Sequence, residues 1–259
     1  MTMKQFILAC LMLFAGVSQA ADNPIGTGDM LHVTVYGNPD LTTDARVTAG
    51  GTISFPLVGE VKVGGISVPM AERKISSLLE DGRFIKRPQV NIVVTQFVSQ
   101  QVSVLGEVQR PGRYPLDRPS TLTDLLAIAG GIGPNGSDQI TVISLRDGKS
   151  SRQEYDLQSM FRKNGSPDVW VSAGDIIYVP RAPVFYIYGE VQHPGVFRLD
   201  RDMVVAQALA SGGGLTPRGT ERGLRIKRRN AKGVLETFSA EATTQLLAND
   251  VLQVQESLF

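Results

Sequence analysis

The sequence predicts an α+β fold made of three small modules, the second and third of which share one plan. Twenty-seven glycines and 14 prolines, placed among many short runs of Val and Ile, indicate numerous turns and strands. Three stretches, 69–81, 122–128 and 203–210, have the apolar spacing and flanking residues typical of helices. One eleven-residue sequence motif, which we call the repeated phrase, occurs at 106–116 and again in similar form at 189–199. Each copy introduces a module.

Each copy of this phrase predicts a strand, a turn and a second strand. Pro111 and Pro194 would occupy the second position of a tight turn, where their restricted φ fits. Gly112 and Gly195 follow, and we expect them to supply the positive φ that a type II turn requires. The motif shared by the two copies consists of Gly106, Glu107, Pro111, Gly112, Gly189, Glu190, Pro194 and Gly195.

The first module is expected to extend over 21–101. A strand at 31–35 should be followed by a hairpin over 46–57, with 61–63 continuing the same small sheet. The helix that follows should bury one apolar stripe, and a strand at 90–94 should come after it. The residues of that stripe are Met70, Ile75, Leu78 and Leu79.

The second and third modules, 102–182 and 183–259, repeat one order: strand, turn, strand, helix, two strands and a closing strand. We expect Thr121 and Asp202 to cap the starts of the two helices. A helix packed across a small mixed sheet in this order is a β-grasp-like plan. The strands expected after the helices are 139–145, 152–157 and 176–179 in the second module and 224–229, 234–238 and 251–254 in the third.

A short turn signal precedes a strand in every module. Gly28-Asp29, Gly174-Asp175 and Asn249-Asp250 stand at corresponding places, and Asn would replace Gly where positive φ is needed. Gly-Asp is a common turn dipeptide, so the signal alone does not establish a shared role. Its recurrence at equivalent points supports the division into three modules.

The first 20 residues are typical of a signal peptide rather than of a folded module. Lys4 precedes an apolar stretch at 6–17 that is too short to span a bilayer, and we expect cleavage between Ala20 and Ala21. Cys10, the one cysteine of the chain, ends a short lipoprotein-like box. Lipid anchoring at Cys10 is disfavoured, because cleavage before it would leave a very short apolar core. We therefore expect an exported mature chain without a thiol.

Composition and motifs argue against several classes of function. A formal net charge of +1 lacks the basic excess of nucleic-acid binders, so we expect no nucleic-acid partner. His32 and His193 have no spacing typical of metal ligands, and no nucleophile-elbow or zinc-protease motif occurs. We expect no enzyme, no metal and no cofactor. Glu107 and Glu190 remain an alternative as a carboxylate pair for glycoside hydrolysis, but their equivalent places in the repeat favour a structural role.

The strongest charge feature is a basic cluster in the third module. Alternation places Leu224 and Ile226 inward on one strand. The outward residues of that strand can form an ordinary solvated hairpin face, or a surface that contacts an acidic polymer or a partner's acidic surface. The contact candidates on this strand are Arg225, Lys227 and Arg229.

Two sets of residues resemble a known family. The first module, through its segments at 26–31, 51–59 and 87–90, resembles the polysaccharide export domain. The two copies of the Gly-Glu-Val-x-x-Pro-Gly phrase resemble the SLBB (soluble-ligand-binding β-grasp) domains that follow it. Over essentially all of its mature length, the chain is similar to outer-membrane polysaccharide export proteins.

This resemblance implies a component of a capsular or exopolysaccharide export machinery, located in the periplasm and associated with the outer membrane. It implies a ring-shaped homo-oligomer, with an octamer as the family's example, that conducts polysaccharide and works with an inner-membrane polysaccharide co-polymerase. Because the sequence stops at 255–259, just after a strand, we also expect a separate outer-membrane pore protein. The alternative function is a periplasmic carbohydrate-binding module without a transport role.

Overall fold

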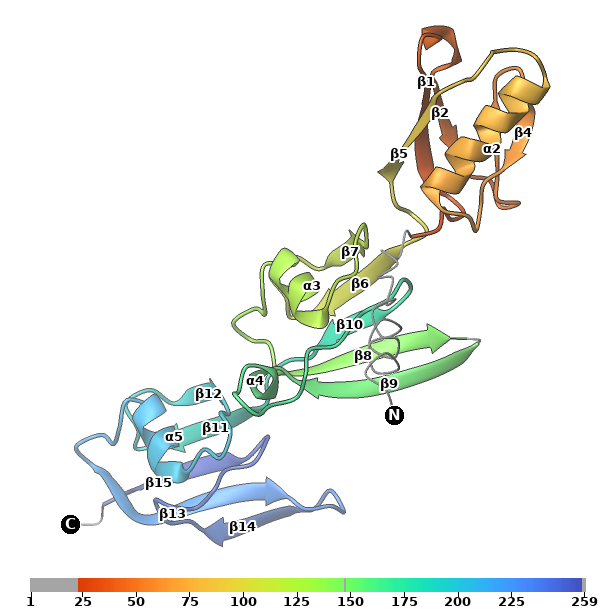
Figure 1. Cartoon of the computed structure of the whole chain (residues 1–259). Coiled ribbons are helices and arrows are strands. Elements are labelled where there is room, and N and C mark those ends of the chain that lie inside the picture. Colours follow the sequence, from red (N-terminus) through yellow and green to blue (C-terminus); the bar gives the residue numbers. More distant parts are fainter. Residues whose placement is uncertain (1–22, 147, 258–259) are drawn as a thin grey trace, which may run out of the picture. The chain divides into compact units, whose positions relative to one another are not determined.

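The computed structural model describes residues 23–146 and 148–257 (Figure 1). The expected signal peptide, with Cys10 and the cleavage site between Ala20 and Ala21, lies outside the described residues. The chain divides into two compact units, one with the residues up to Val102 together with Pro115–Ser120, the other with Ser103–Tyr114 and the residues from Thr121 onward. The fold class is α+β, as predicted. The module boundaries at 101/102 and 182/183 stay a prediction.

The first unit contains two small sheets and one long helix. In the three-stranded sheet, β1 (Met30–Val35) lies between β2 (Thr43–Arg46) and β5 (Val90–Gln96), and both pairings are antiparallel. β3 (Thr52–Phe55) and β4 (Gly59–Lys62) form a second, two-stranded sheet. A short 3-10 turn, η1 (Pro39–Leu41), and the helix α2 (Val68–Asp81) complete the unit.

The predicted hairpin over 46–57 is wrong in its pairing. β3 pairs with β4 rather than with β2, and the two strands form a sheet of their own instead of extending the first. Leu57, with φ of +66°, and Gly59, with φ of +77°, form the turn after β3. Because this turn reverses the chain within 56–58, the strand that follows it is the one placed beside β3.

Two residues of the stripe predicted for α2, Ile75 and Leu79, are buried, and the prediction is wrong for Met70. Ala71, Ile75 and Leu79 are buried, four residues apart along one side of the helix. Met70 is 50% exposed, and Leu78 is partly buried at the edge of the core. In the first turn the helical period places the small Ala71 inward instead of the larger Met70.

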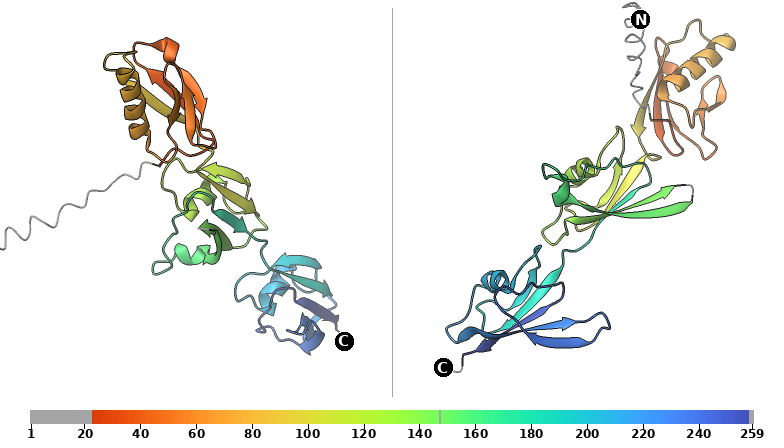
Figure 2. Two further views of the ribbon diagram at one scale, coloured as in Figure 1. Left: turned by 90° about the vertical axis from the view of Figure 1, so that its right-hand side faces the viewer. Right: turned by 60° about the horizontal axis from the view of Figure 1, so that its bottom comes forward.

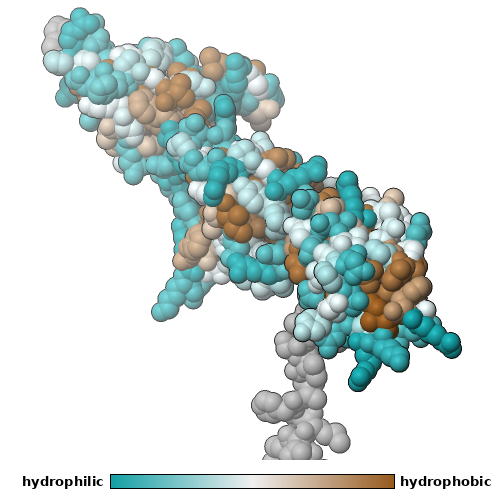
Figure 3. All heavy atoms as spheres, turned by 90° about the horizontal axis from the view of Figure 1, so that it is seen from above, coloured by the Kyte–Doolittle hydropathy of each residue, from teal (hydrophilic) through white to brown (hydrophobic). Residues whose placement is uncertain are grey.

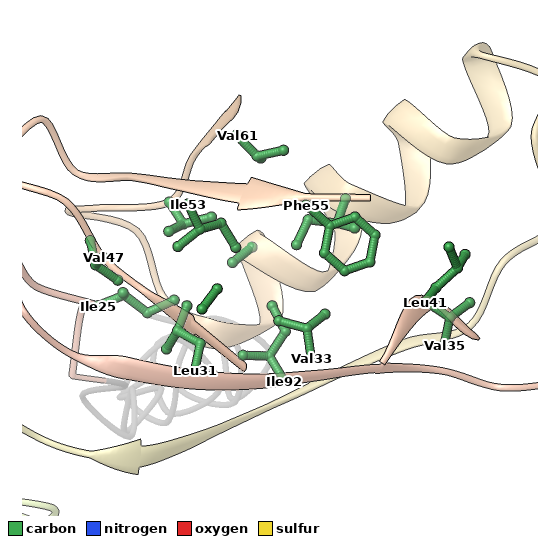
Figure 4. Close-up of a cluster of buried hydrophobic side chains, with 14 of the residues drawn as sticks. Ile25, Leu31, Val33, Val35, Leu41, Val47, Ile53, Phe55, Val61 and Ile92 are labelled. Carbon is green, nitrogen blue, oxygen red and sulfur yellow. The ribbon is translucent and has the colours of Figure 1, made fainter. Parts of the chain in front are cut away.

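The core of the first unit lies between its two sheets and α2. Ile53 and Phe55 of β3 face Leu31 and Val33 of β1 and Ile92 of β5 (Figure 4). All five side chains are at most 5% exposed. Full burial of a side chain of this kind stabilises a fold by about 1.5–3 kcal/mol relative to exposure. This core therefore gives the first module its own source of stability.

The remaining strands form two five-stranded sheets with the same strand order. The second module has β6 (Gln101–Gly106), β7 (Gly112–Pro115), β8 (Gln139–Arg146), β9 (Lys149–Asp156) and β10 (Ile176–Val179) in the order β7-β6-β10-β8-β9. The third has β11 (Val184–Gly189), β12 (Gly195–Arg198), β13 (Gly219–Arg229), β14 (Leu235–Ser239) and β15 (Val251–Glu256) in the order β12-β11-β15-β13-β14.

In each of these sheets the strand that opens the module pairs in parallel with the strand that closes it, β6 with β10 and β11 with β15. One helix lies on one face of each sheet, α3 (Leu122–Ile128) in the second module and α5 (Val205–Ser211) in the third (Figures 1 and 2). A further short helix, α4 (Leu157–Met160), follows β9. Among the residues that the structure describes, no helix of the same module covers the opposite face of either sheet.

The repeated phrase forms the opening hairpin of both sheets, but the prediction for its glycines is wrong. Gly106 and Gly189 have positive φ, +90° and +97°, whereas Gly112 and Gly195 begin β7 and β12 without it. A Cβ atom at Gly106 or Gly189 would lie 2.0 Å from a carbonyl oxygen of the closing strand. Glycine is therefore required where the parallel strands approach each other, not in the Pro-Gly turn.

The two helices start differently. Thr121 caps α3 as predicted: its hydroxyl accepts a hydrogen bond from the Asp124 N–H at 3.3 Å, and the Asp124 carboxylate accepts one from the Thr121 N–H at 3.1 Å. Asp202 is not the cap of α5. It has φ of +52°, and the helix begins after Val204, whose N–H donates to the Gln207 side chain at 2.9 Å. A residue in the left-handed region lies outside the extended region typical of an N-cap.

The turn signal found in all three modules places a buried carboxylate at the start of a strand. Asp29, Asp175 and Asp250 are 1%, 3% and 0% exposed. Each carboxylate accepts a hydrogen bond of 2.7–2.8 Å from the backbone N–H three residues earlier. The turn thereby satisfies its own buried side chain, which makes the repeat a structural feature rather than a chance dipeptide. The preceding residues have positive φ as predicted: Gly28, Gly174 and Asn249.

Candidate functional site

The face of the third sheet opposite α5 combines aromatic, amide and basic side chains, and we call it the outer face. Phe185 and Ile187 of β11 are buried against α5, so Tyr186 and Tyr188 lie on the other side, 39% and 36% exposed. On β13, Leu224 and Ile226 are fully buried, as predicted. The outer face consists of Tyr186, Tyr188, Arg225, Lys227, Arg229, Gln253 and Gln255.

Strand register brings these residues together from distant parts of the chain. Gln253 of β15 lies opposite Tyr188 on one side and Arg225 on the other. In the next row, Val251 separates Tyr186 from Lys227. The outer face is therefore a continuous surface in which a tyrosine, an uncharged residue and a base follow one another across three strands.

Lys227 is oriented by Tyr188. Its Nζ lies 2.6 Å from the Tyr188 hydroxyl and 5.2 Å from the centre of the Tyr188 ring. A cation above an exposed aromatic ring contributes about 0.5–1 kcal/mol. The contact restrains both side chains and places a positive charge beside an aromatic surface.

A cavity of about 640 Å³ adjoins the outer face where β11 and β15 end and β13 begins. It arises beside a bulge in β13, because Thr220 pairs with Gln255 and Arg225 already pairs with Gln253. Thr220, Arg222, Gln253 and Gln255 line this cavity. Hydroxyl, guanidinium and amide groups at one place offer several hydrogen bonds to a polar, hydroxylated ligand.

The two glutamates of the repeated phrase are held in separate ion pairs. Glu190 accepts a hydrogen bond from the Thr216 hydroxyl at 2.5 Å and one from Arg218 at 2.9 Å. These bonds, that of Thr216 first, keep the pKa of Glu190 below its ordinary value. Glu107 accepts from Arg181 at 2.8 Å. The lowered pKa of Glu190 makes this carboxylate unsuited to the role of general acid. Each glutamate is bound to an arginine of its own module, which supports the structural interpretation.

The rest of the basic cluster is divided between surface and interior. Arg229, the third contact candidate, is exposed and donates to the Gly233 carbonyl oxygen at 3.1 Å, near the β13–β14 turn. Arg228 points to the opposite face and pairs with the buried Asp250, at 2.6 Å. The alternation along β13 thus separates Arg228 from its neighbours Lys227 and Arg229.

Sequence reasoning did not find the aromatic and amide part of the outer face. Alternation over 184–188 could have placed Tyr186 and Tyr188 on one side of a strand. That they adjoin Gln253 and Lys227 depends on the parallel pairing of β11 with β15, which joins residues more than sixty positions apart. No local pattern carries that information.

The described residues contain no group of three or more His, Cys, Asp or Glu side chains placed to hold a metal ion. Among the same residues, no helix has the length and apolar character needed to cross a bilayer. On the face shown in Figure 3, apolar residues lie in separate patches among hydrophilic ones.

Comparison with protein families matches most of the chain. Residues 17–95 match the family described as polysaccharide biosynthesis/export protein, and residues 100–179 and 184–239 each match the SLBB domain. The chain belongs to the polysaccharide biosynthesis/export family. It carries one export domain followed by two SLBB domains, as the resemblance of the sequence indicated.

Several curated proteins are similar over most of this chain. EPS I polysaccharide export outer membrane protein EpsA of Ralstonia nicotianae is 28% identical over 255 residues, which cover 87% of this chain and 66% of EpsA. EpsA of Ralstonia solanacearum is also 28% identical, with 87% and 67% covered. Polysialic acid transport protein KpsD of Escherichia coli is 29% identical over 174 residues, or 66% of this chain and 30% of KpsD. The chain therefore spans about two thirds of the length of the EpsA proteins.

Proposed function

We propose that this protein is a non-enzymatic component of a machinery that exports a capsular or extracellular polysaccharide. The observation that carries the proposal is the order of domains, an export domain followed by two SLBB domains in one chain. The names of the EpsA and KpsD relatives, which refer to polysaccharide export and transport, support it. In this function the protein conducts and contacts a polymer and makes or breaks no covalent bond.

Copies of the chain assemble into a ring-shaped conduit in the periplasm, associated with the outer membrane. The ring receives polymer from an inner-membrane polysaccharide co-polymerase and passes it to the outer-membrane step. The outer-membrane location is supported by the printed name of the EpsA relatives. The bare sheet faces of the second and third modules leave surface for contacts with polymer or with another copy.

The outer face of the third module contacts the polymer. Arg225, Lys227 and Arg229 give this face a positive charge, and tyrosine and glutamine side chains lie beside them. Such a surface suits an acidic polysaccharide, because cations attract its carboxylates while aromatic and amide groups meet its rings and hydroxyls. KpsD is named for polysialic acid, which is itself an acidic polysaccharide.

Deletion of the gene, followed by localisation of the polymer, tests the export function. We expect loss of surface polysaccharide, with precursor accumulating inside the cell or synthesis stalling. Normal surface polymer in the deletion strain would contradict export. In that case a strictly monomeric purified protein that binds the polymer would indicate a carbohydrate-binding module without a transport role.

Complementation with altered outer faces tests the contact. The triple variant Arg225→Glu, Lys227→Glu, Arg229→Glu should fold but restore little surface polymer, since it repels an acidic chain. The control is Arg73→Glu, Lys149→Glu, Arg152→Glu, which reverses the same number of exposed charges outside this face. Equal restoration by both variants would remove the outer face from the proposal and leave the export function standing.

A further inference from the structure

The single tryptophan of the chain, Trp170, is held on the surface of the second module. Its side chain is 68% exposed. Val171 beside it is 7% exposed, and Val169 is partly buried, so the extended segment points its valines inward and its large ring outward. A large apolar ring that stays exposed gives up the stabilisation that its burial would bring, which makes its position informative.

The backbone that carries Trp170 is tied to the start of α3. The Leu122 N–H donates to the Val169 carbonyl oxygen at 2.8 Å, and Thr121 and Trp170 form an antiparallel bridge. Asp168 secures the same segment from the other side. Its carboxylate accepts the Val169 N–H at 2.7 Å and a hydrogen bond from the Thr123 hydroxyl. The ring is therefore presented from a restrained support, which lowers the entropy cost of binding a ligand.

The third module shows that the fold does not need an aromatic residue at this place. There Val204 forms the equivalent bridge with Gln245, and Val205 N–H donates to the Thr244 carbonyl oxygen at 2.9 Å. Leu246, which follows, is 2% exposed and corresponds to Val171. With the same backbone arrangement, one module carries tryptophan and the other glutamine. The structural role of the position leaves the exposed indole unexplained.

We propose that Trp170 is a carbohydrate-stacking site, on which the apolar face of one sugar ring of the transported polymer rests. This inference rests on the proposed export function. The indole supplies a flat apolar surface, and the groups beside it in the chain and across the bridge are hydroxyls and a carboxylate, from Thr121, Thr123 and Asp168. Sugars combine the same two characters, apolar C–H faces and a rim of hydroxyls.

The size of the feature favours a sugar ring over a protein partner. A stable protein interface buries about 800 Å² on each side, whereas a single aromatic side chain buries about 150–250 Å². Arg162 and Lys163, exposed in the same connection between β9 and β10, add positive charge that suits an acidic polymer. The site therefore adds a second contact, in a different module, to the outer face.

Fluorescence tests the site directly, because Trp170 is the only tryptophan. The purified mature protein is titrated with the native polysaccharide, and emission and acrylamide quenching are followed. We expect the emission to change on binding and the quenching by acrylamide to fall. Calorimetry on Trp170→Gln, which introduces the residue of the third module, should show affinity reduced by about tenfold, as for loss of one stacked ring. Trp170→Phe should lose less.

The matched control is Phe161→Gln, which removes another exposed aromatic ring, 74% exposed, from the same connection. It should leave polymer affinity unchanged. Polymer binding to the wild-type protein with unchanged Trp170 emission and quenching would overturn the site while leaving the export function intact. A fall in the acrylamide quenching of Trp170 when only the protein concentration is raised would overturn the stacking site in favour of contact with another copy of the chain. The same fall with lipid vesicles alone would overturn it in favour of contact with a membrane. Normal surface polymer in the deletion strain would instead contradict the export function.

Discussion

The guanidinium of Arg228 holds the buried carboxylate of Asp250 at two points, with Nε 2.8 Å from Oδ1 and Nη2 2.6 Å from Oδ2. The bond to Asp250 raises the pKa of Arg228 above its ordinary value. The carboxylate also accepts the Leu247 N–H at 2.7 Å. This arrangement links β13 to the turn before β15, and so joins the two strands that carry most of the outer face.

Replacement of Asp250 should therefore destabilise the third module. In Asp250→Ala, Arg228 loses its partner and the Leu247 N–H is left without its acceptor, so we expect the free energy of unfolding to fall by about 3 kcal/mol. Urea unfolding measures this. Glu241→Ala, which removes an exposed carboxylate from the same module, should change stability by less than about 0.5 kcal/mol. Similar losses in both variants would disprove the importance of the pair.

The repeated phrase provides a test in which each glycine has its control nearby. Gly106→Ala and Gly189→Ala combine positive φ with a Cβ atom 2.0 Å from a carbonyl oxygen, so each should lower the free energy of unfolding by at least about 2 kcal/mol. Gly112→Ala and Gly195→Ala meet no atom closer than 3.9 Å and should be nearly neutral. Thermal unfolding of the four variants decides whether strand approach or the Pro-Gly turn requires glycine.

The acid sensitivity of the second unit should depend on Arg201. Its guanidinium bonds Asp156 at 2.7 Å and Asp138 at 2.9 Å, and the bond to Arg201 is the main cause that lowers the pKa of Asp156 from 3.8 to about 2. Because the folded-state pKa is depressed, this contribution to stability is present above about pH 4 and is lost as the pH falls toward 2.

Arg201→Gln should thus be less stable than the wild type at pH 7 and lose less stability between pH 4 and pH 2. Melting temperatures measured from pH 2 to pH 7 test both parts. Arg113→Gln, which removes an exposed arginine from β7, should leave the pH profile as in the wild type. Parallel pH profiles for wild type and Arg201→Gln would show that the ion pair does not control acid sensitivity.

Binding of an acidic polymer to the outer face should weaken as salt is added. Charges separated by more than about 10 Å are largely screened at 0.1 M salt, so the long-range attraction of Arg225, Lys227 and Arg229 falls first. Neutralising all three with Gln should lower affinity at low salt and flatten its salt dependence. Calorimetry at several salt concentrations measures this, and Arg73→Gln, Lys149→Gln, Arg152→Gln is the control with three other exposed bases. An unchanged salt dependence in the outer-face variant would place the ionic contacts elsewhere.

Local features of the fold were predictable because neighbouring residues determine them. The capping box of Thr121 and Asp124 and the positive φ of Asn249 both follow from side-chain chemistry within a few positions. The positive φ was predicted for Gly112 from the local Pro-Gly turn, but Gly106 has it instead. The clash that selects glycine at Gly106 comes from a strand about seventy residues away, which no local pattern reveals.

For the candidate site, the basic residues of one strand could be predicted from the sequence, whereas their neighbours on other strands could not. The period of a strand separated Arg225 and Lys227 from the inward Leu224 and Ile226. The contact of Lys227 with Tyr188 joins residues 39 positions apart and required the register of three strands. Trp170 was not singled out, because its exposure becomes evident only when the segment is seen bridged to Thr121.

By itself, the sequence determined the α+β class, the order of three modules, most strand and helix positions, and membership of the polysaccharide export family. These depend on local periodicity, turn chemistry and a repeated phrase, all of which are present in the unfolded chain. The tertiary structure decided which strands pair, where glycine is required, and which side chains share a surface. These features could not be predicted from the sequence alone, because the pairing of distant strands depends on the summed packing of many residues rather than on the preference of any one segment.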